Sequence, residues 1–312
     1  MIINIKRYKL IIMKKLFFVS MLLTAALAAQ AQMGTKIAPK MAKGTEKVYV
    51  TKSVSTIPGQ KEINITAETK YTVVDATADG YLIDAIVTSF ESDVTSDNVA
   101  GKILTASEEL MKGLKIRLAT NKDGKVEKIA NYDELKPQIE SMSNQLVDKM
   151  LEAVPQLSQM MSKDVLKTQV TESINEESLV KSMQSATSVL TLNGKTLMTG
   201  AQEEYINEMG VKMKRMYFVN GKNITTNSSM DMSKDELKKL VIAQVEKMAP
   251  EQASVVKENI DAVMDSGMIK IDVKETATYE LADDNWVKSI KAEVNNETMG
   301  QKMTVATTVT LK

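Results

Sequence analysis

The sequence predicts an α+β fold in which one large curved antiparallel sheet of about ten strands forms a half-barrel, covered on one face by helices. Two observations predict this fold. Segments rich in Val, Ile, Thr and Tyr follow one another with turn residues between them, which is typical of strands joined by hairpins. Amphipathic helical patterns occur in two blocks between groups of strands, and such helices must bury their apolar sides against the sheet.

The chain begins with the pattern of a secretory signal peptide over residues 1–31. Lys14 and Lys15 form a short positive end, Leu16–Leu27 is apolar, and small residues precede Gln32 at the cleavage site. The apolar stretch is too short to span a bilayer stably. Because Met13 alone opens a complete signal, we expect it to be the true start and the protein to be exported.

Composition limits the location and the partners of the exported chain. Removing residues 1–31 takes away five of the 40 basic residues and no acidic ones, leaving 35 against 40 with no basic block, so nucleic acid is not an expected partner. No later apolar run is long enough for a transmembrane segment. Cysteine is absent, which excludes the lipid anchor of bacterial lipoproteins. We therefore expect a soluble protein of the periplasm or the cell exterior.

The absence of histidine excludes several kinds of active site. Ser–His–Asp and Cys–His nucleophile systems cannot form, and zinc sites of the usual kind need imidazole or thiolate ligands. Neither glycine-rich phosphate-binding motif, GxxxxGK[ST] or GxGxxG, occurs. We expect a protein that is not an enzyme, with no catalytic residues, no metal ligands and no cofactor.

The first half of the chain contains five predicted strands. Residues 32–46 are expected to form a flexible lead, and residues 47–312 a single domain. The strands are Val48–Thr56, Glu62–Asp75, Tyr81–Ser92, Leu114–Asn121 and Lys125–Asn131. The turns between paired strands contain Pro58-Gly59, Asp79-Gly80 and Asp123-Gly124, because Gly takes the positive φ that tight reversals need. Between the two strand groups, Thr105–Glu108 has the spacing of a capping box and predicts a short helix.

A helical insertion is predicted over about residues 133–190. Asp133 is expected to cap its first helix, and Pro155 to end or kink it. Apolar residues recur on this helix at spacings of three and four: Leu135, Ile139, Met142, Leu146 and Met150. Two further helical pieces are expected up to about Leu190. Residues 193–210 show no clear pattern and receive no assignment.

The second half predicts a hairpin, a long helix and three strands. Asn220-Gly221 joins strands Val211–Val219 and Lys222–Met230 and favours a type I′ turn. A capping box at Ser233–Glu236 starts a helix that runs to Met264, with Pro250 restarting it. The last three strands are Ile269–Leu281, Trp286–Asn295 and Met303–Leu311. The second half therefore loosely reverses the element order of the first.

The Ser233–Met264 helix is expected to lie with its apolar stripe against the sheet and its charged residues in water. The stripe consists of Leu237, Leu240, Val241, Val245, Met248, Val256, Ile260 and Val263. The charged residues are Lys238, Lys239, Glu246 and Lys247.

The element order, together with Gly113–Leu135 (GLKIRLATNKDGKVEKIANYDEL), resembles a group of uncharacterised exported proteins of Bacteroides-type bacteria. It is also similar to the half-barrel of the lipoprotein-localisation (LolA-like) superfamily, whose helices lie across a concave sheet. The signal peptide ending in AQAQ fits the same bacteria. The resemblance covers that hairpin and the general order of elements, and it brings no catalytic motif and no functional residue with it.

Methionine is the residue type that most suggests a binding site. Nineteen methionines follow residue 31, and flexible thioethers suit pockets for apolar ligands, although the same residues fill ordinary cores. The candidate lining of an apolar site is Met142, Leu146, Met150, Met213, Leu240, Met248 and Met264. A Cu(I) site at Met209, Met213, Met216, Met230 and Met232 is disfavoured because no His or Cys assists it.

Two carboxylate pairs, Asp283-Asp284 and Glu203-Glu204, are candidates for acid–base chemistry. Neighbours on a strand point to opposite faces, so neither pair is arranged for it, and Asp283–Asn285 is expected to form a hairpin turn. Trp286 is expected to cover the sheet face that it begins.

These observations favour an exported, soluble, non-enzymatic protein that binds a hydrophobic or lipid-like ligand between the sheet and the helices. The alternative is a structural or interaction module of the cell envelope, whose Thr-rich C-terminal strands pair with an envelope protein. A glycan hydrolase is the third hypothesis and needs two facing acids in a cleft.

Overall fold

The computed structural model describes residues 34–94, 111–155, 158, 162–207, 210–248, 253–265, 271–298 and 301–312. The predicted signal peptide, the Thr105–Glu108 capping box, Met209 and Pro250 lie outside these ranges, as do the side chains of Lys247, Met248 and Val263.

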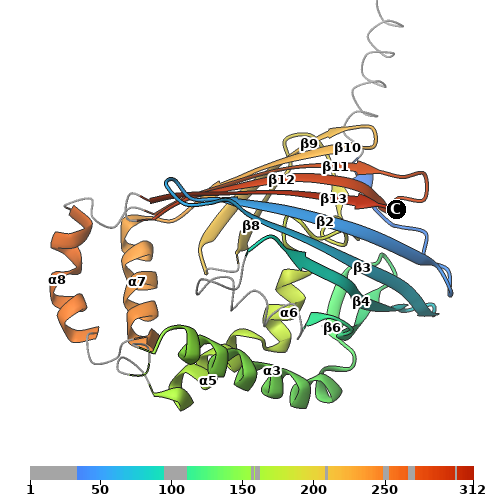
Figure 1. Ribbon diagram of the computed structural model, residues 1–312. Helices are drawn as coiled ribbons and strands as arrows, with labels where there is room; N and C mark the ends of the chain where they lie inside the picture. The colour runs from blue at the N-terminus through green and yellow to red at the C-terminus, as the bar shows by residue number, and fades with distance from the viewer. Residues whose placement is uncertain are drawn as a thin grey trace, which may run out of the picture.

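The large curved antiparallel sheet is present and open (Figure 1). In the described residues it has 11 strands: β2 (Glu46–Thr56), β3 (Ile63–Ala76), β4 (Gly80–Ser92), β5 (Lys115–Asn121), β6 (Val126–Ile129), β8 (Gln202–Ile206), β9 (Lys212–Asn220), β10 (Asn223–Met230), β11 (Ile271–Leu281), β12 (Val287–Thr298) and β13 (Gln301–Leu311). A separate two-stranded sheet joins β1 (Thr35–Lys36) to β7 (Thr196–Leu197). The fold class is therefore α+β, as predicted.

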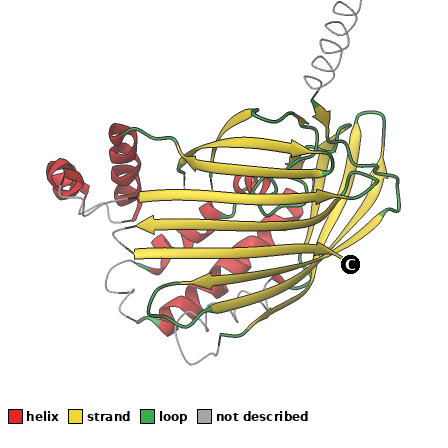
Figure 2. Cartoon of the chain, turned by 90° about the horizontal axis from the view of Figure 1, so that it is seen from above, coloured by secondary structure: helices red, strands yellow, loops and turns green. Residues whose placement is uncertain are grey.

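The strand order is β6-β5-β4-β3-β2-β13-β12-β11-β10-β9-β8. Each half of the chain forms a meander, and the two meanders join at the centre, where β2 pairs with β13. Figure 2 shows the strands side by side, with the helices behind them or beyond one end. The strands of the first half therefore run from β2 at the centre to the β6 edge, and those of the second half from β13 at the centre to the β8 edge.

The helices form the two predicted blocks, but only one block covers the sheet. The described helices are α3 (Tyr132–Ala153), α5 (Lys163–Ser173), α6 (Glu176–Ser182), α7 (Lys234–Met248) and α8 (Ala253–Asp265). α3, α5 and α6 lie beneath the sheet, whereas α7 and α8 stand together beyond the ends of the strands (Figures 1 and 2). Of these described helices, none is long and apolar enough to cross a membrane.

The prediction that one long helix lies along the sheet is wrong for most of its length. The chain instead forms two helices that pack on each other, with ion pairs Lys238–Asp261 (2.6 Å) and Lys257–Glu246 (2.5 Å). Lys238 is therefore paired and not mostly in water. Leu240 of α7 does reach the sheet end, where it packs on a small apolar cluster with Val211, Met213 and Val273. Beyond this point α7 and α8 contact each other, and Ile260 of α8 is buried. The sequence pattern alone cannot distinguish such helix–helix packing from packing on a sheet.

Three local predictions also need correction. Gly80 does not have a positive φ; a Cβ at this position would lie 1.8 Å from the carbonyl oxygen of Thr120, so Gly is required for close approach of β4 and β5. Asn220 pairs with Asn223, and of the two loop residues only Gly221 has a positive φ (58°), which is the arrangement of a type II′ turn and not type I′. The α3 cap position is Asn131 and not Asp133, and Asn131 uses its side chain to bond the backbone of β5.

The core lies between the sheet and the segments beneath it. Trp286, Tyr49, Tyr217 and Tyr279 are among its largest fully buried side chains, and Trp286 donates from Nε1 to the carbonyl oxygen of Lys40 (3.0 Å). Residues 34–45, expected to belong to a flexible lead, contribute buried Ile37 and Met41 to this core. The apolar side chains of this short segment and its pairing with β7 hold it in place.

Candidate functional site

Residues 183–195 have no regular secondary structure and cover part of one face of the sheet. We call this stretch the covering segment. It begins where α6 ends and buries Val189, Leu190 and Leu192 in the core. At one end, the Tyr279 hydroxyl donates to the Ala186 carbonyl oxygen (2.7 Å), and at the other, the Asn193 amide donates to the Gly124 carbonyl oxygen (3.2 Å). The covering segment is therefore tied both to β11 of the sheet and to the β5–β6 turn.

A pocket of about 490 Å³ lies between the covering segment and the sheet. Its volume falls within the roughly 300–1,000 Å³ that is usual for small-molecule sites. The lining is mostly apolar and comes from the covering segment, from Lys125 and Val126 at the edge that ends in β6, and from β8, β9, β11, β12 and β13. The pocket thus lies between the covering segment and strands β8 to β13, with the β5–β6 turn beside it.

The sheet contributes a row of side chains whose polarity changes across the strands. Cross-strand pairing aligns Glu203 with Arg215, Arg215 with Ser228, Ser228 with Glu275, Glu275 with Val294, and Val294 with Val305. Directly paired residues on neighbouring strands point to the same face. The row is therefore charged or polar over β8 to β11 and apolar over β12 and β13.

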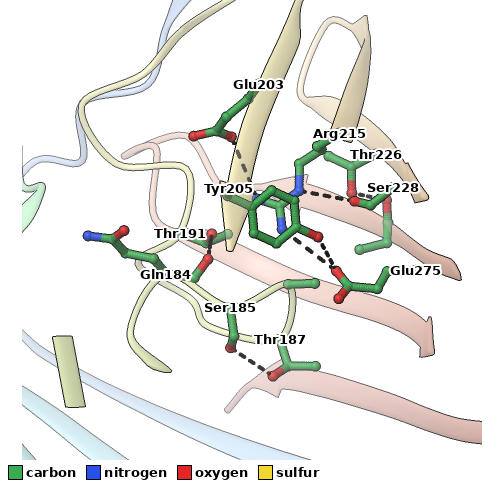
Figure 3. Close-up of polar contacts among 12 residues, drawn as sticks. Gln184, Ser185, Thr187, Thr191, Glu203, Tyr205, Arg215, Thr226, Ser228 and Glu275 are labelled. Atoms are coloured by element: carbon green, nitrogen blue, oxygen red, sulfur yellow. Dashed lines mark hydrogen bonds and ion pairs between the residues drawn. The ribbon is translucent and has the colours of Figure 1, made fainter. Parts of the chain in front are cut away.

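Arg215 is the centre of the charged part. Only 2% of the residue is exposed, its guanidinium lies 4.1 Å from the centroid of the Tyr205 ring, and its Nε donates to Ser228 Oγ (3.3 Å). Figure 3 shows Arg215 between Glu203 and Glu275. The carboxylate oxygens lie 3.7 and 3.8 Å from its terminal nitrogens, and the buried Nη2 has no hydrogen-bond partner among the described residues. A buried donor without an acceptor is costly, so this group is held by ion pairing and stacking with incomplete compensation.

Lys195 and Tyr217 satisfy Glu203 from the other side. The Lys195 ammonium donates to both oxygens of Glu203 (2.6 Å each) and to the Tyr217 hydroxyl (2.9 Å), and this hydroxyl donates to Glu203. Glu275 accepts a hydrogen bond from the Tyr205 hydroxyl (2.6 Å). Both carboxylates in the pocket are therefore already engaged by neighbouring groups.

Burial and charge move the pKa values of these groups in different directions. Burial opposes ionisation of Glu203, but hydrogen bonds and charges from Lys195, Tyr217 and Arg215 outweigh it and lower the Glu203 pKa. Burial lowers the pKa of Lys195, and the charges of Arg215 and Lys125 add to this, so Glu203 offsets the effect only in part. Burial raises the Tyr205 pKa to about 12. The ionised carboxylate is thus stabilised more than the ammonium that bonds it.

The acidic residues of the site and of the predicted carboxylate pairs do not cluster. The described residues contain no group of three or more His, Cys, Asp or Glu side chains that could hold a metal ion. Glu203 and Glu204 point to opposite faces of β8, as expected, because Glu203 bonds Lys195 whereas Glu204 pairs with Lys212 (3.3 Å). Asp283–Asn285 forms the expected hairpin turn, with Asn285 at a φ of 62°.

None of the seven residues predicted to line an apolar site contributes to this pocket. Met142, Leu146 and Met150 are partly buried on α3, and Met264 is partly buried on α8. The structure brings together Met213 and Leu240, which pack in the small cluster at the sheet end. For Met248 only the backbone of α7 is described. The hypothesis that these residues line a ligand site stays a prediction.

Sequence reasoning missed the residues that form the pocket. Residues 193–210, which received no assignment, supply Lys195, Glu203 and Tyr205. A signal for Arg215 was present, because it lies between Met213 and Tyr217 on the inward face of β9. A charged residue on the apolar face of an alternating strand indicates a buried ion pair or a binding site.

Comparisons with known proteins do not assign the chain to a family. No protein-family model and no curated protein matches it significantly. Among solved structures, lipovitellin, in a study of its lipid–protein interactions, is 8% identical with a TM-score of 0.38, and the match covers 88% of this chain and 25% of that chain. An exported Bacteroides fragilis protein with a YmcC-like fold is 7% identical with a TM-score of 0.25, covering 89% and 99%.

An S-type phycobiliprotein lyase from Guillardia theta is 6% identical with a TM-score of 0.21, covering 87% of this chain and 88% of that chain. The match to lipovitellin, by contrast, spans only a quarter of the length of that protein. At these TM-scores the matches carry no argument about function, and the resemblance to the LolA-like superfamily stays a prediction.

Proposed function

We propose that this protein is an exported, soluble, non-enzymatic binding protein that holds a hydrophobic or lipid-like ligand between its sheet and the covering segment. The observation that carries the proposal is the pocket of about 490 Å³ with mostly apolar walls. Concave, largely apolar pockets with a few convergent polar groups are the usual form of small-molecule sites. Export rests on the signal-peptide pattern before Gln32.

The ligand lies beside Val294 and Val305, where the sheet row is apolar. Both side chains are only partly buried in the protein as it stands, so an apolar ligand gains the hydrophobic free energy of covering them. The charged row next to them fixes the orientation of a ligand with one polar end. The absence of histidine and cysteine and the prior engagement of both carboxylates favour binding without chemistry.

Titration of the delipidated protein with Nile red, a neutral apolar dye, tests this proposal. We expect saturable binding with one dye per chain. Val305→Trp fills the pocket and should weaken binding at least about tenfold, because a bulky side chain in the pocket excludes the ligand or forces strain. Ala306→Trp is the matched control, since Ala306 is the next residue on β13 and is exposed. Absence of saturable binding, or equal effects of both variants, would overturn the proposal.

The strand order argues against the alternative that the C-terminal strands pair with another envelope protein. The C-terminal strands β11, β12 and β13 each have a hydrogen-bonded neighbour on both sides, so none of them presents a free edge to another protein. The edges of the sheet are β6 and β8, two of its shortest strands.

A further inference from the structure

The pocket carries an excess of positive charge at one end. Its lining includes four cationic residues, Lys125, Lys181, Lys195 and Arg215, and two acidic ones, Glu203 and Glu275. Lys181 pairs on the surface with Glu177 (2.7 Å), outside the pocket lining. The two carboxylates within the lining are therefore shared between Arg215 and Lys195, and nothing in the lining neutralises Lys125.

Lys125 and Lys195 lie at the same end of the pocket. Lys125 stands in the β5–β6 turn against Gly194, where a Cβ on Gly194 would come within 3.1 Å of the Cβ of Lys125. Its charge is close enough to contribute to lowering the pKa of the neighbouring Lys195. The Lys125 ammonium forms no hydrogen bond or ion pair with any residue that the structure describes. Lys125 is exposed and Lys195 is half-buried, so this end of the pocket reaches solvent.

Arg215 adds a fixed charge behind these lysines. Its carboxylate neighbours stay beyond hydrogen-bond distance, at 3.7 and 3.8 Å, and its Nη2 lacks an acceptor. Glu203 and Glu275 together balance the charges of Arg215 and Lys195, so the positive charge that the lining leaves unbalanced at this end is that of Lys125. At the other end of the lining, Val294, Met303 and Val305 supply apolar surface and no charge.

We propose that the ligand of this pocket is an amphiphile with an anionic head and an apolar chain, its head paired with Lys125 next to the Lys195–Glu203 ion pair and its chain lying over Val294 and Val305. The inference rests on the proposed function and names its ligand class. A carboxylate or phosphate head supplies the acceptor that the Lys125 ammonium lacks, whereas the three donors of Lys195 already bond Glu203 and Tyr217. An apolar chain replaces water along the valines, so head and chain bind at the two ends that differ in chemistry.

Isothermal titration with three C12 ligands tests the inference: dodecanoate and dodecyl phosphate, each below its micelle concentration, and dodecanol below its solubility limit. Dodecanoate or dodecyl phosphate should bind at least about tenfold more tightly than dodecanol, the size of one hydrogen bond to a charged group. The two anions distinguish a carboxylate head from a phosphate head. Equal affinity of all three ligands would overturn the anionic head and leave the proposed function standing. Binding of none of them would count against both.

Substitution of Lys125 locates the head. Lys125→Gln should weaken binding of the preferred anion about threefold, as expected for a partly exposed ion pair, and leave dodecanol binding unchanged. Lys122→Gln is the matched control, because Lys122 lies in the same turn, is exposed and does not line the pocket. Equal effects of Lys125→Gln on the anion and the alcohol, or of the two lysine variants on the anion, would refute the placement of the head.

Discussion

Tyr279→Phe tests how much one buried hydrogen bond, from the Tyr279 hydroxyl to Ala186, contributes to holding the covering segment against the sheet. Tyr279 has no exposed surface, and its hydroxyl donates to the carbonyl oxygen of buried Ala186 (2.7 Å). Phe keeps the ring and leaves no cavity, so the change removes only the hydroxyl. The carbonyl oxygen then lacks a partner, which costs about 1–3 kcal/mol of the free energy of unfolding. In a chain of this size, each kcal/mol lowers Tm by about 2–4 °C.

The assay is a thermal melt together with hydrogen exchange of the covering segment. The amides around Ala186 should exchange faster in the variant, because the loss of an anchor favours local opening. Tyr71→Phe is the control: burial raises the Tyr71 pKa to about 12, yet its hydroxyl has no hydrogen-bond partner among the described residues. If both variants melted alike and exchange near Ala186 did not change, the covering segment would be held in another way.

Three further outcomes are expected. Leu240→Asp should lower the free energy of unfolding in urea by about 2–4 kcal/mol, because it places a charge in the apolar cluster at the sheet end. Lys239→Asp, on the exposed face of α7, should be nearly neutral. Equal effects of the two variants would show that α7 does not pack on this cluster. Because the pKa of Glu203 is lowered in the folded protein, its ionised form stabilises the fold at pH values above the ordinary pKa of 4.5, and this stability is lost as the pH falls through the folded-state pKa. Glu203→Gln should therefore flatten the pH dependence of urea unfolding below about pH 4.5. An unchanged pH profile would refute the ion pairing of Glu203. Intact-mass analysis of the protein recovered from the producing bacterium should give a chain beginning at Gln32, and a retained leader would contradict cleavage.

Local patterning was enough to predict most of the sheet. Alternation and turn residues placed strands such as β5 and β9 within a residue or two of their ends, because both signals come from residues close together in the sequence. The β2–β13 pair that joins the two meanders could not be predicted in this way. The paired residues are more than 200 positions apart in the sequence, so no hairpin turn between them indicates the pairing.

The candidate site was less accessible from the sequence for the same reason. The methionine hypothesis followed apolar stripes on helices, but a stripe does not say whether its partner is a sheet, another helix or a ligand. The pocket depends on an irregular segment around Leu190 and Lys195, which has no periodicity because its position is fixed by contacts with distant elements. Arg215 is the residue that could have indicated the site, since a charge on an inward strand position needs an explanation.

The central claim is that an apolar chain binds over the valine end of the sheet row, and a crystal structure with 12-bromododecanol tests it most directly. The bromine gives an anomalous signal that locates the end of the chain without reference to its polar head. The account predicts a bromine peak in the pocket beside Val294 and Val305, and no peak there in Val305→Trp. A peak elsewhere, for example among the methionines of α3, or an empty pocket with the ligand in excess, would contradict it.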